Sequence, residues 1–166
     1  MSDILKPQAG EMSLIYTVVD ITELMHSCIK EFSCSIEYKK GNLSLELEKV
    51  PPVRADKEIM YHVVFNLMSH ALRNTRREGT VSIRCKAQAG MVIVEVVDEG
   101  DAVPEALRDR MFDHTLFADT GFQGAKGLGL AFCRLAAEGH GGSIRYDSGG
   151  KTRNHITLEL PAGNQS

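Results

Sequence analysis

Two β-rich runs near the middle of the chain constrain the fold more than any other feature. Apolar residues alternate with other side chains over residues 80–86, residues 91–98 are mostly Val and Ile, and Gly90 lies between the two runs. This pattern predicts a β-hairpin. Apolar residues at helical spacing flank the hairpin over residues 56–74 and 127–138. Because each apolar face must be buried against another element, we expect a two-layer α+β sandwich, with helices on one face of a mixed, mostly antiparallel sheet.

Further elements are expected on both sides of this centre. Residues 13–19 are rich in β-formers and predict a strand, and Asp20 with Glu23 forms a capping-box pattern that begins a helix ending near residue 33. Asp56 is expected to cap the helix that ends near Asn74. The other expected elements are strands at 43–48, 143–147 and 155–160, a short helix at 104–112 and a loop at 113–126. Residues 13–162 are predicted to form one domain, between an N-terminal segment (1–12) and a short tail (163–166).

Composition excludes several classes of function. The net charge of −3 gives no sign of a nucleic-acid surface, which needs clustered Lys and Arg. The four cysteines form no C-x-x-C pair, so a zinc site is not expected. No apolar run approaches the roughly 20 residues that span a bilayer, and the N-terminus lacks a signal-peptide pattern. We therefore expect a cytoplasmic stretch without direct membrane contact, and leave open a longer protein with membrane spans elsewhere.

Four segments hold the residues that are chemically most informative. They are residues 66–75, 97–104, 111–117 and 124–130. In this order they resemble the N-box, the first glycine box, the F-box and the second glycine box of the GHKL ATPase superfamily, at the spacing found in sensor histidine kinases. The resemblance covers about residues 13–160. It implies a Bergerat-type ATP-binding fold, ATP and Mg²⁺ as ligands, and a loop at 113–126 that acts as an ATP lid.

The resemblance also implies roles for single residues. Asp98 would accept a hydrogen bond from the adenine amine, with Gly100 letting the backbone pass close to the base. Gly127 and Gly129 would open a helix whose free N–H groups suit a triphosphate. Asn66 and His70 would occupy the catalytic and metal-binding positions. The full set of expected nucleotide-binding residues is Asn66, His70, Arg73, Asn74, Asp98, Gly100, Ala102, Phe117, Lys126, Gly127, Leu128, Gly129 and Leu130.

Two residues depart from the family pattern. His70 stands where the family has the second Asn of the N-box, which holds Mg²⁺, and imidazole suits this hard cation poorly. Ala102 stands where the first glycine box has its second glycine, and an L-residue there would be strained if the position required a positive φ. Two interpretations stay open: an active kinase that tolerates His70, and a degenerate regulatory module that handles Mg-ATP weakly.

The resemblance implies partners and a reaction. The ATP γ-phosphate would pass to a histidine on a separate dimerisation domain of the same kinase, and from there to a response regulator; the full-length protein would be a homodimer. Residues 4–12 resemble the end of a dimerisation helix. A hydrolysing relative of the gyrase, chaperone or mismatch-repair kind is less consistent, because those proteins place a glutamate base where this chain has Asn66. A serine kinase acting on an anti-sigma partner is a further alternative.

Overall fold

The computed structural model describes residues 13–39, 42–113 and 124–162. The main sheet has five strands in the order β2-β4-β5-β7-β6. They are β2 (Asn42–Leu47), β4 (Thr80–Gln88), β5 (Met91–Asp98), β7 (Asn154–Pro161) and β6 (Ser143–Ser148). The β2–β4 pair is parallel, and the other pairs are antiparallel. A second, two-stranded sheet pairs β1 (Thr17–Val19) with β3 (Val53–Ala55).

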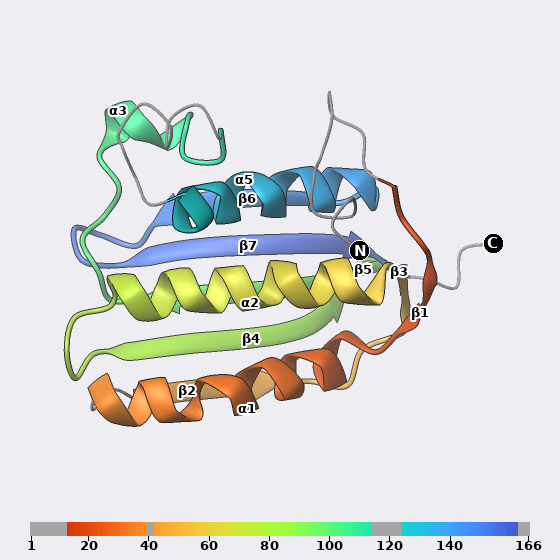
Figure 1. The fold of residues 1–166 in the computed structure, drawn as a ribbon, viewed down its shortest axis with the longest axis horizontal. Helices are drawn as coiled ribbons and strands as arrows, with labels where there is room; N and C mark the ends of the chain where they lie inside the picture. The colour runs from red at the N-terminus through yellow and green to blue at the C-terminus, as the bar shows by residue number, and fades with distance from the viewer. Residues whose placement is uncertain (1–12, 40–41, 114–123, 163–166) are drawn as a thin grey trace.

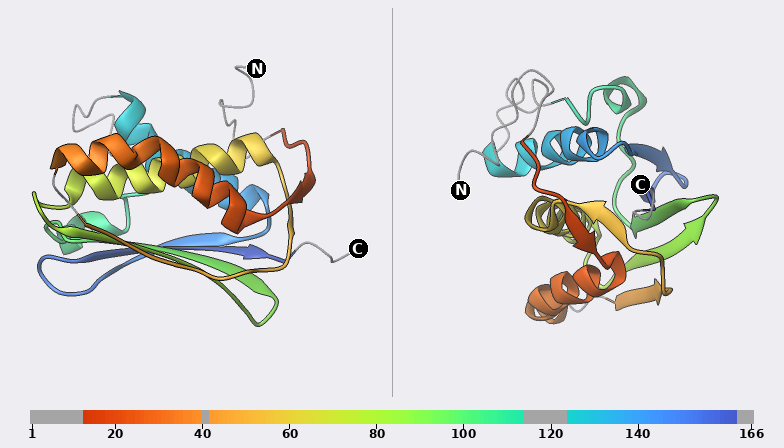
Figure 2. Two further views of the ribbon diagram at one scale, coloured as in Figure 1. Left: turned by 90° about the horizontal axis from the view of Figure 1, so that it is seen from below. Right: turned by 90° about the vertical axis from the view of Figure 1, so that its right-hand side faces the viewer.

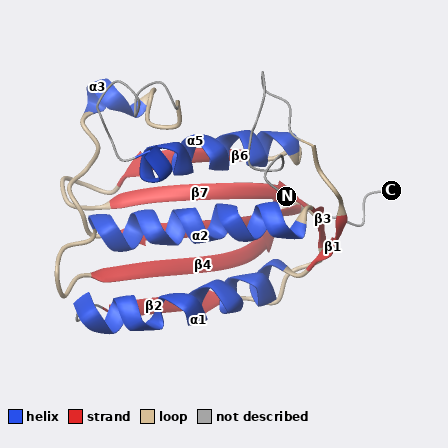
Figure 3. Cartoon of the chain, viewed as in Figure 1, coloured by secondary structure: helices blue, strands red, loops and turns tan. Residues whose placement is uncertain are grey.

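Three long helices cover one face of the sheet (Figure 1). They are α1 (Ile21–Lys39), α2 (Lys57–Asn74) and α5 (Gly124–Gly139), with α2 in the middle (Figure 3). The short helix α3 (Glu105–Arg108) lies toward the same end of the molecule, on the left in Figure 1, as the start of α5. Seen along the sheet, the helices form one layer and the strands the other (Figure 2). The core lies between the layers, since the fully buried side chains of α2 and of β4 and β7 all face this interface.

The opposite face of the sheet carries ion pairs instead of a second layer. Arg84 contacts Glu46 at 3.1 Å and Glu95 at 3.5 Å, and Arg145 contacts Glu159 at 2.6 Å. Antiparallel sheets commonly leave one face to water in this way. The sandwich therefore has two layers, as the sequence predicts. None of the helices described here is both long and apolar enough to cross a bilayer.

The predicted elements are mostly confirmed, with five main differences. The first strand begins at Thr17 instead of residue 13, and α1 continues to Lys39. β3 was not expected at all, because three residues after two prolines give no periodic signal. α5 begins at Gly124, three residues before the predicted start. The short helix is a single turn, and residues 109–112 after it form turns.

The beginning of α2 is tied to two other parts of the chain. Asp56 caps the helix, because its Oδ1 accepts a hydrogen bond from the Ile59 amide at 3.1 Å. Its Oδ2 accepts another from the Ile15 amide at 2.9 Å. The Asp56 amide in turn donates to His140 Nε2 at 3.0 Å, while Nδ1 of the same ring lies 2.7 Å from the Ala136 carbonyl. One end of α2 is thus fastened to the N-terminal approach of the chain and to the end of α5.

Candidate functional site

Several of the expected site residues lie toward the opposite end of α2. There, the last residue of β5, the C-terminal end of α2 and the N-terminal half of α5 lie on the same side of the molecule (Figure 1). Asp98 is 2% exposed and faces the helix layer. Its Oδ1 accepts hydrogen bonds from the Gly100 amide at 2.9 Å and from Asn154 Nδ2 at 2.8 Å. The carboxylate that the sequence assigns to base recognition is therefore held in one orientation at a strand end.

Gly100 approaches the protein itself more closely than a side chain would allow. A Cβ on Gly100 would lie 2.2 Å from the carbonyl oxygen of Asn74, the last residue of α2. The φ of Gly100 is not among the positive values in the described chain. In the structure this glycine makes room for the end of α2, and its closeness to the base stays a prediction.

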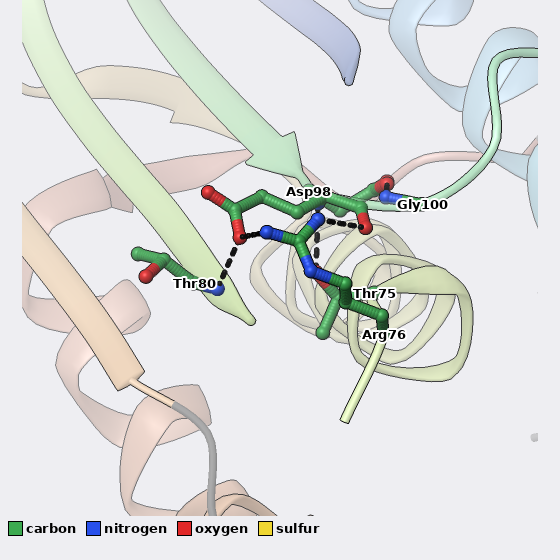
Figure 4. A network of polar contacts seen from close by, with 6 residues as sticks. Thr75, Arg76, Thr80, Asp98 and Gly100 are labelled. Carbon is green, nitrogen blue, oxygen red and sulfur yellow. Dashed lines mark hydrogen bonds and ion pairs between the residues drawn. The ribbon is translucent and has the colours of Figure 1, made fainter. Parts of the chain in front are cut away.

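A polar cluster around Glu99, which the sequence did not indicate, joins α2 to β4 and β5 (Figure 4). The Glu99 amide donates to Thr75 Oγ1 at 2.7 Å. Glu99 Oε1 lies 3.1 Å from Arg76 Nη2 and accepts from the Thr80 amide at 3.0 Å. The cluster holds the backbone between Asp98 and Gly100, and so fixes the end of β5 relative to the end of α2.

Asn66 and Arg73, two of the expected site residues on α2, lie in different environments. Asn66 is half-buried and lies against α5, since a Cβ on Gly129 would meet its Cγ and Oδ1 at 3.4 Å each. Arg73 is exposed and donates to Ser69 Oγ at 2.6 Å. The structure thus brings Asn66 and Gly129 together, and leaves the Arg73 guanidinium on its own helix.

The start of α5 differs from the sequence prediction. Gly127 and Gly129 lie inside the helix, because it begins at Gly124. Lys126, expected in a loop, is also within its bounds. The first N–H groups of an α-helix have no partner within the helix. In α5 these groups therefore belong to the turn that precedes Gly127 and Gly129. Leu130 is buried in the core. Phe117 lies outside the described residues, as does most of the predicted lid, and the side chains of Lys126 and Leu128 are not described.

His70 is half-buried and already has a partner. Its Nε2 lies 2.7 Å from Asn74 Nδ2, and because an amide nitrogen only donates, Nε2 is the acceptor and Nδ1 carries the proton. Burial lowers the pKa of His70 to about 4, and the neighbouring Arg73 guanidinium contributes to this shift. The imidazole is therefore neutral at pH 7, and its lone pair points to Asn74.

Ala102 is not strained. The non-glycine residues with positive φ in the described chain are Glu78 and Ala89, so Ala102 adopts an ordinary conformation. Its amide donates to the Lys151 carbonyl at 2.8 Å, which joins this loop to the turn between β6 and β7. The condition under which alanine would strain this position, a positive φ, is therefore not met.

The sequence pattern did not indicate two residues of the site. Asn154 stands directly opposite Asp98 in the β5–β7 ladder, and Tyr146 on β6 donates its hydroxyl proton to Asn154 Oδ1. Asn154 also lies within reach of the Gly100 and Asp101 carbonyls. The sequence carries no signal for these contacts, since they depend on strand register across three strands.

The chain matches a known family and several known proteins. Residues 55–164 match the family described as histidine kinase-, DNA gyrase B-, and HSP90-like ATPase. Adaptive-response sensory kinase SasA of Gloeothece citriformis (strain PCC 7424) is 31% identical over 147 residues, 84% of this chain and 36% of that protein. Alginate biosynthesis sensor protein KinB of Pseudomonas aeruginosa is 29% identical over 143 residues, 85% of this chain and 24% of that protein. The chain thus spans well under half the length of either relative.

Solved structures agree in fold and extent. The catalytic domain of histidine kinase ThkA, in a nucleotide-free form, is 25% identical with a TM-score of 0.77, over 90% of this chain and 99% of that one. Full-length ShkA in complex with AMPPNP shares the fold, with a TM-score of 0.79 and 23% identity over 92% of this chain and 32% of that one. The family match, the sensor-kinase relatives and the shared sandwich together lead to one conclusion: this chain belongs to the histidine kinase-, DNA gyrase B-, and HSP90-like ATPases, as an ATP-binding catalytic domain of the sensor histidine kinase type.

Proposed function

We propose that this domain binds ATP with the adenine against Asp98 and the phosphates between α2 and the N-terminal half of α5. We further propose that the whole protein passes the γ-phosphate to a histidine on a separate dimerisation domain, and then to a response regulator. The observation that carries the proposal is the buried Asp98 carboxylate, held by two N–H donors at a strand end beside α2. The packing of Asn66 against Gly129 supports the proposed phosphate region.

The chain's own residues would mainly position the nucleotide. A carboxylate only accepts hydrogen bonds, so Asp98 suits the amino group of adenine. In phosphoryl transfer, catalysis consists largely of positioning and charge neutralisation, which requires no nucleophile from this domain. Asn66 is the residue best placed to orient the phosphates, since its amide faces α5.

Of the two residues expected to bind Mg²⁺, only Asn66 offers a suitable donor atom. The Asn66 side chain offers a hard oxygen donor facing α5, which suits Mg²⁺. His70 offers a nitrogen whose lone pair already accepts from Asn74. When bound, Mg²⁺ would neutralise phosphate charge. We propose that Asn66 holds it and that His70 contributes little, so the coupling between Mg²⁺ and nucleotide is weak.

The base-recognition part is tested by Asp98→Asn. The substitution keeps the size of the side chain but places an N–H₂ or a weaker acceptor toward the adenine amine. We expect ADP affinity to fall roughly tenfold or more, from the loss of a hydrogen bond to a charged group. Isothermal titration measures this, with Asp101→Asn as control because Asp101 is an exposed carboxylate three residues further on. Equal ADP affinity in parent and Asp98→Asn would remove Asp98 from the proposal.

The metal-binding part is tested by His70→Asn, which supplies an oxygen donor. Nucleotide affinity is measured with Mg²⁺ and with EDTA for both proteins. We expect Mg²⁺ to strengthen nucleotide binding only slightly in the parent and more strongly in the variant. Phosphotransfer to a separately supplied, histidine-bearing dimerisation domain should also be faster in the variant. A strong Mg²⁺ dependence in the parent that the substitution leaves unchanged would contradict the weak coupling.

A further inference from the structure

A chain of hydrogen bonds runs across three strands to reach Asp98. It begins at the Val103 amide, which donates to the Tyr146 hydroxyl at 3.0 Å. That hydroxyl donates to Asn154 Oδ1, and Asn154 Nδ2 donates to Asp98 Oδ1 at 2.8 Å. Asn154 is 2% exposed. Buried side-chain amides usually have hydrogen-bond partners for their polar atoms. Among the described residues, every buried side-chain nitrogen and oxygen has such a partner.

The chain fixes which way the Asn154 amide points. Three oxygen acceptors surround Nδ2: Asp98 Oδ1, the Asp101 carbonyl at 3.1 Å and the Gly100 carbonyl at 3.2 Å. The reverse orientation would place Oδ1 against these three oxygens. The Tyr146 hydroxyl favours the same orientation of the Asn154 amide. Its oxygen accepts a hydrogen bond from the Val103 amide, so its proton is available to donate to Asn154 Oδ1.

Tyr146 is itself held in place from outside the sheet. The Arg108 guanidinium lies over its ring, 5.6 Å from the centroid, and Arg108 Nε donates to the Val103 carbonyl at 2.9 Å. The ring position therefore does not depend on the hydroxyl alone. Removing the hydroxyl would alter the hydrogen-bond chain while leaving this stacking in place.

We infer that Tyr146 and Asn154 are positioning residues that orient the Asp98 carboxylate, and so make the site select purines with a 6-amino group over those with a 6-oxo group. This inference rests on the proposed function, in which Asp98 reads the base. With Oδ1 held by the Gly100 amide and Asn154, the plane of the carboxylate is set. An acceptor in a fixed position matches the amine of adenine and opposes the carbonyl of hypoxanthine, and such polar mismatches discriminate strongly.

The test compares ATP with ITP, which differ at position 6 of the purine, in the parent and in Tyr146→Phe. The parent should bind ATP more tightly than ITP. Tyr146→Phe should weaken ATP binding roughly fivefold, the effect of one hydrogen bond, and leave ITP affinity within about twofold. Titration calorimetry gives the affinities, and thermal unfolding verifies that the variant is folded. Tyr16→Phe is the matched control, because it removes a hydroxyl that bonds to Gly139 at the other end of α5; both affinities should stay unchanged.

The possible results distinguish a failure of the positioning role of Tyr146 and Asn154 from a failure of base recognition by Asp98. A parent that binds ATP and ITP equally would overturn base reading by Asp98, and the inference with it. A parent that prefers ATP, with Tyr146→Phe weakening both nucleotides alike or neither, would overturn the inference alone. Asn154→Asp gives a second measurement, because it places a carboxylate against the three oxygens that surround Nδ2. A selective loss of ATP binding would support the inference. An equal loss of ATP and ITP binding would oppose it.

Discussion

At the scale of single residues, the contact between Gly100 and the end of α2 leaves no room for a side chain. A Cβ would lie within 2.2 Å of the Asn74 carbonyl oxygen and 2.8 Å of its carbon, both backbone atoms that cannot rotate away. The glycine motif could be read from the sequence, but its reason could not. Motif letters do not distinguish a positive φ from a close approach, and for the same reason the sequence could not decide whether Ala102 would be strained.

Replacing Gly100 with alanine is expected to destabilise the fold by about 1–3 kcal/mol, the usual range for overpacking. Urea unfolding measures the change. Gly129→Ala is the matched control, because its Cβ would meet Asn66 at an ordinary 3.4 Å and alanine favours a helix. If both variants unfolded at the same urea concentration as the parent, the close approach would not constrain this position.

At the scale of elements, α2 is held at both ends. Its N-terminal end bonds through Asp56 to Ile15 and His140, and its C-terminal end meets Gly100. The Asp56 cap was predicted from the sequence and is confirmed. The Ile15 and His140 bonds were not predictable, because both partners are distant along the chain. The Asp20 cap of α1 is likewise confirmed by the bond that its Oδ1 accepts from the Glu23 amide.

Asp56→Ala is expected to lower the free energy of unfolding by about 2 kcal/mol, at the upper end for a lost N-cap, because the Ile15 amide also loses its acceptor. Asp56→Asn keeps a capping oxygen and should lose less. Chemical denaturation of the three proteins ranks them. A loss as large for asparagine as for alanine would mean that the cap itself contributes little.

At the scale of the whole molecule, neighbouring residues of β4 belong to different environments. Ile83 is fully buried beneath the helices, whereas Arg84 on the other face takes part only in partly exposed ion pairs. The alternation was readable in the sequence, and so was the two-layer class. The order of the strands could not be predicted, because no local sequence pattern indicates that β2 pairs in parallel with β4.

The two faces should differ sharply in mutational cost. Ile83→Ala should destabilise the protein by about 2–5 kcal/mol, whereas Arg84→Met should change stability by less than about 1 kcal/mol, as expected for exposed ion pairs. Thermal or urea unfolding of both variants gives the comparison. A large loss for Arg84→Met would indicate that the charged face is structurally important after all.

The parallel pairing of β2 with β4 also bears on how the chain folds. Asn42 pairs with Thr80 and Leu47 with Cys85, so the whole of β3 and α2 lies between the partners. The β4–β5 hairpin, in contrast, closes around Gln88 and Met91. Loop-closure entropy grows with the length of chain enclosed, and distant pairings are slow to form. The hairpin is therefore expected to pair early, and the edge strand β2, which encloses a longer stretch of chain, to pair later.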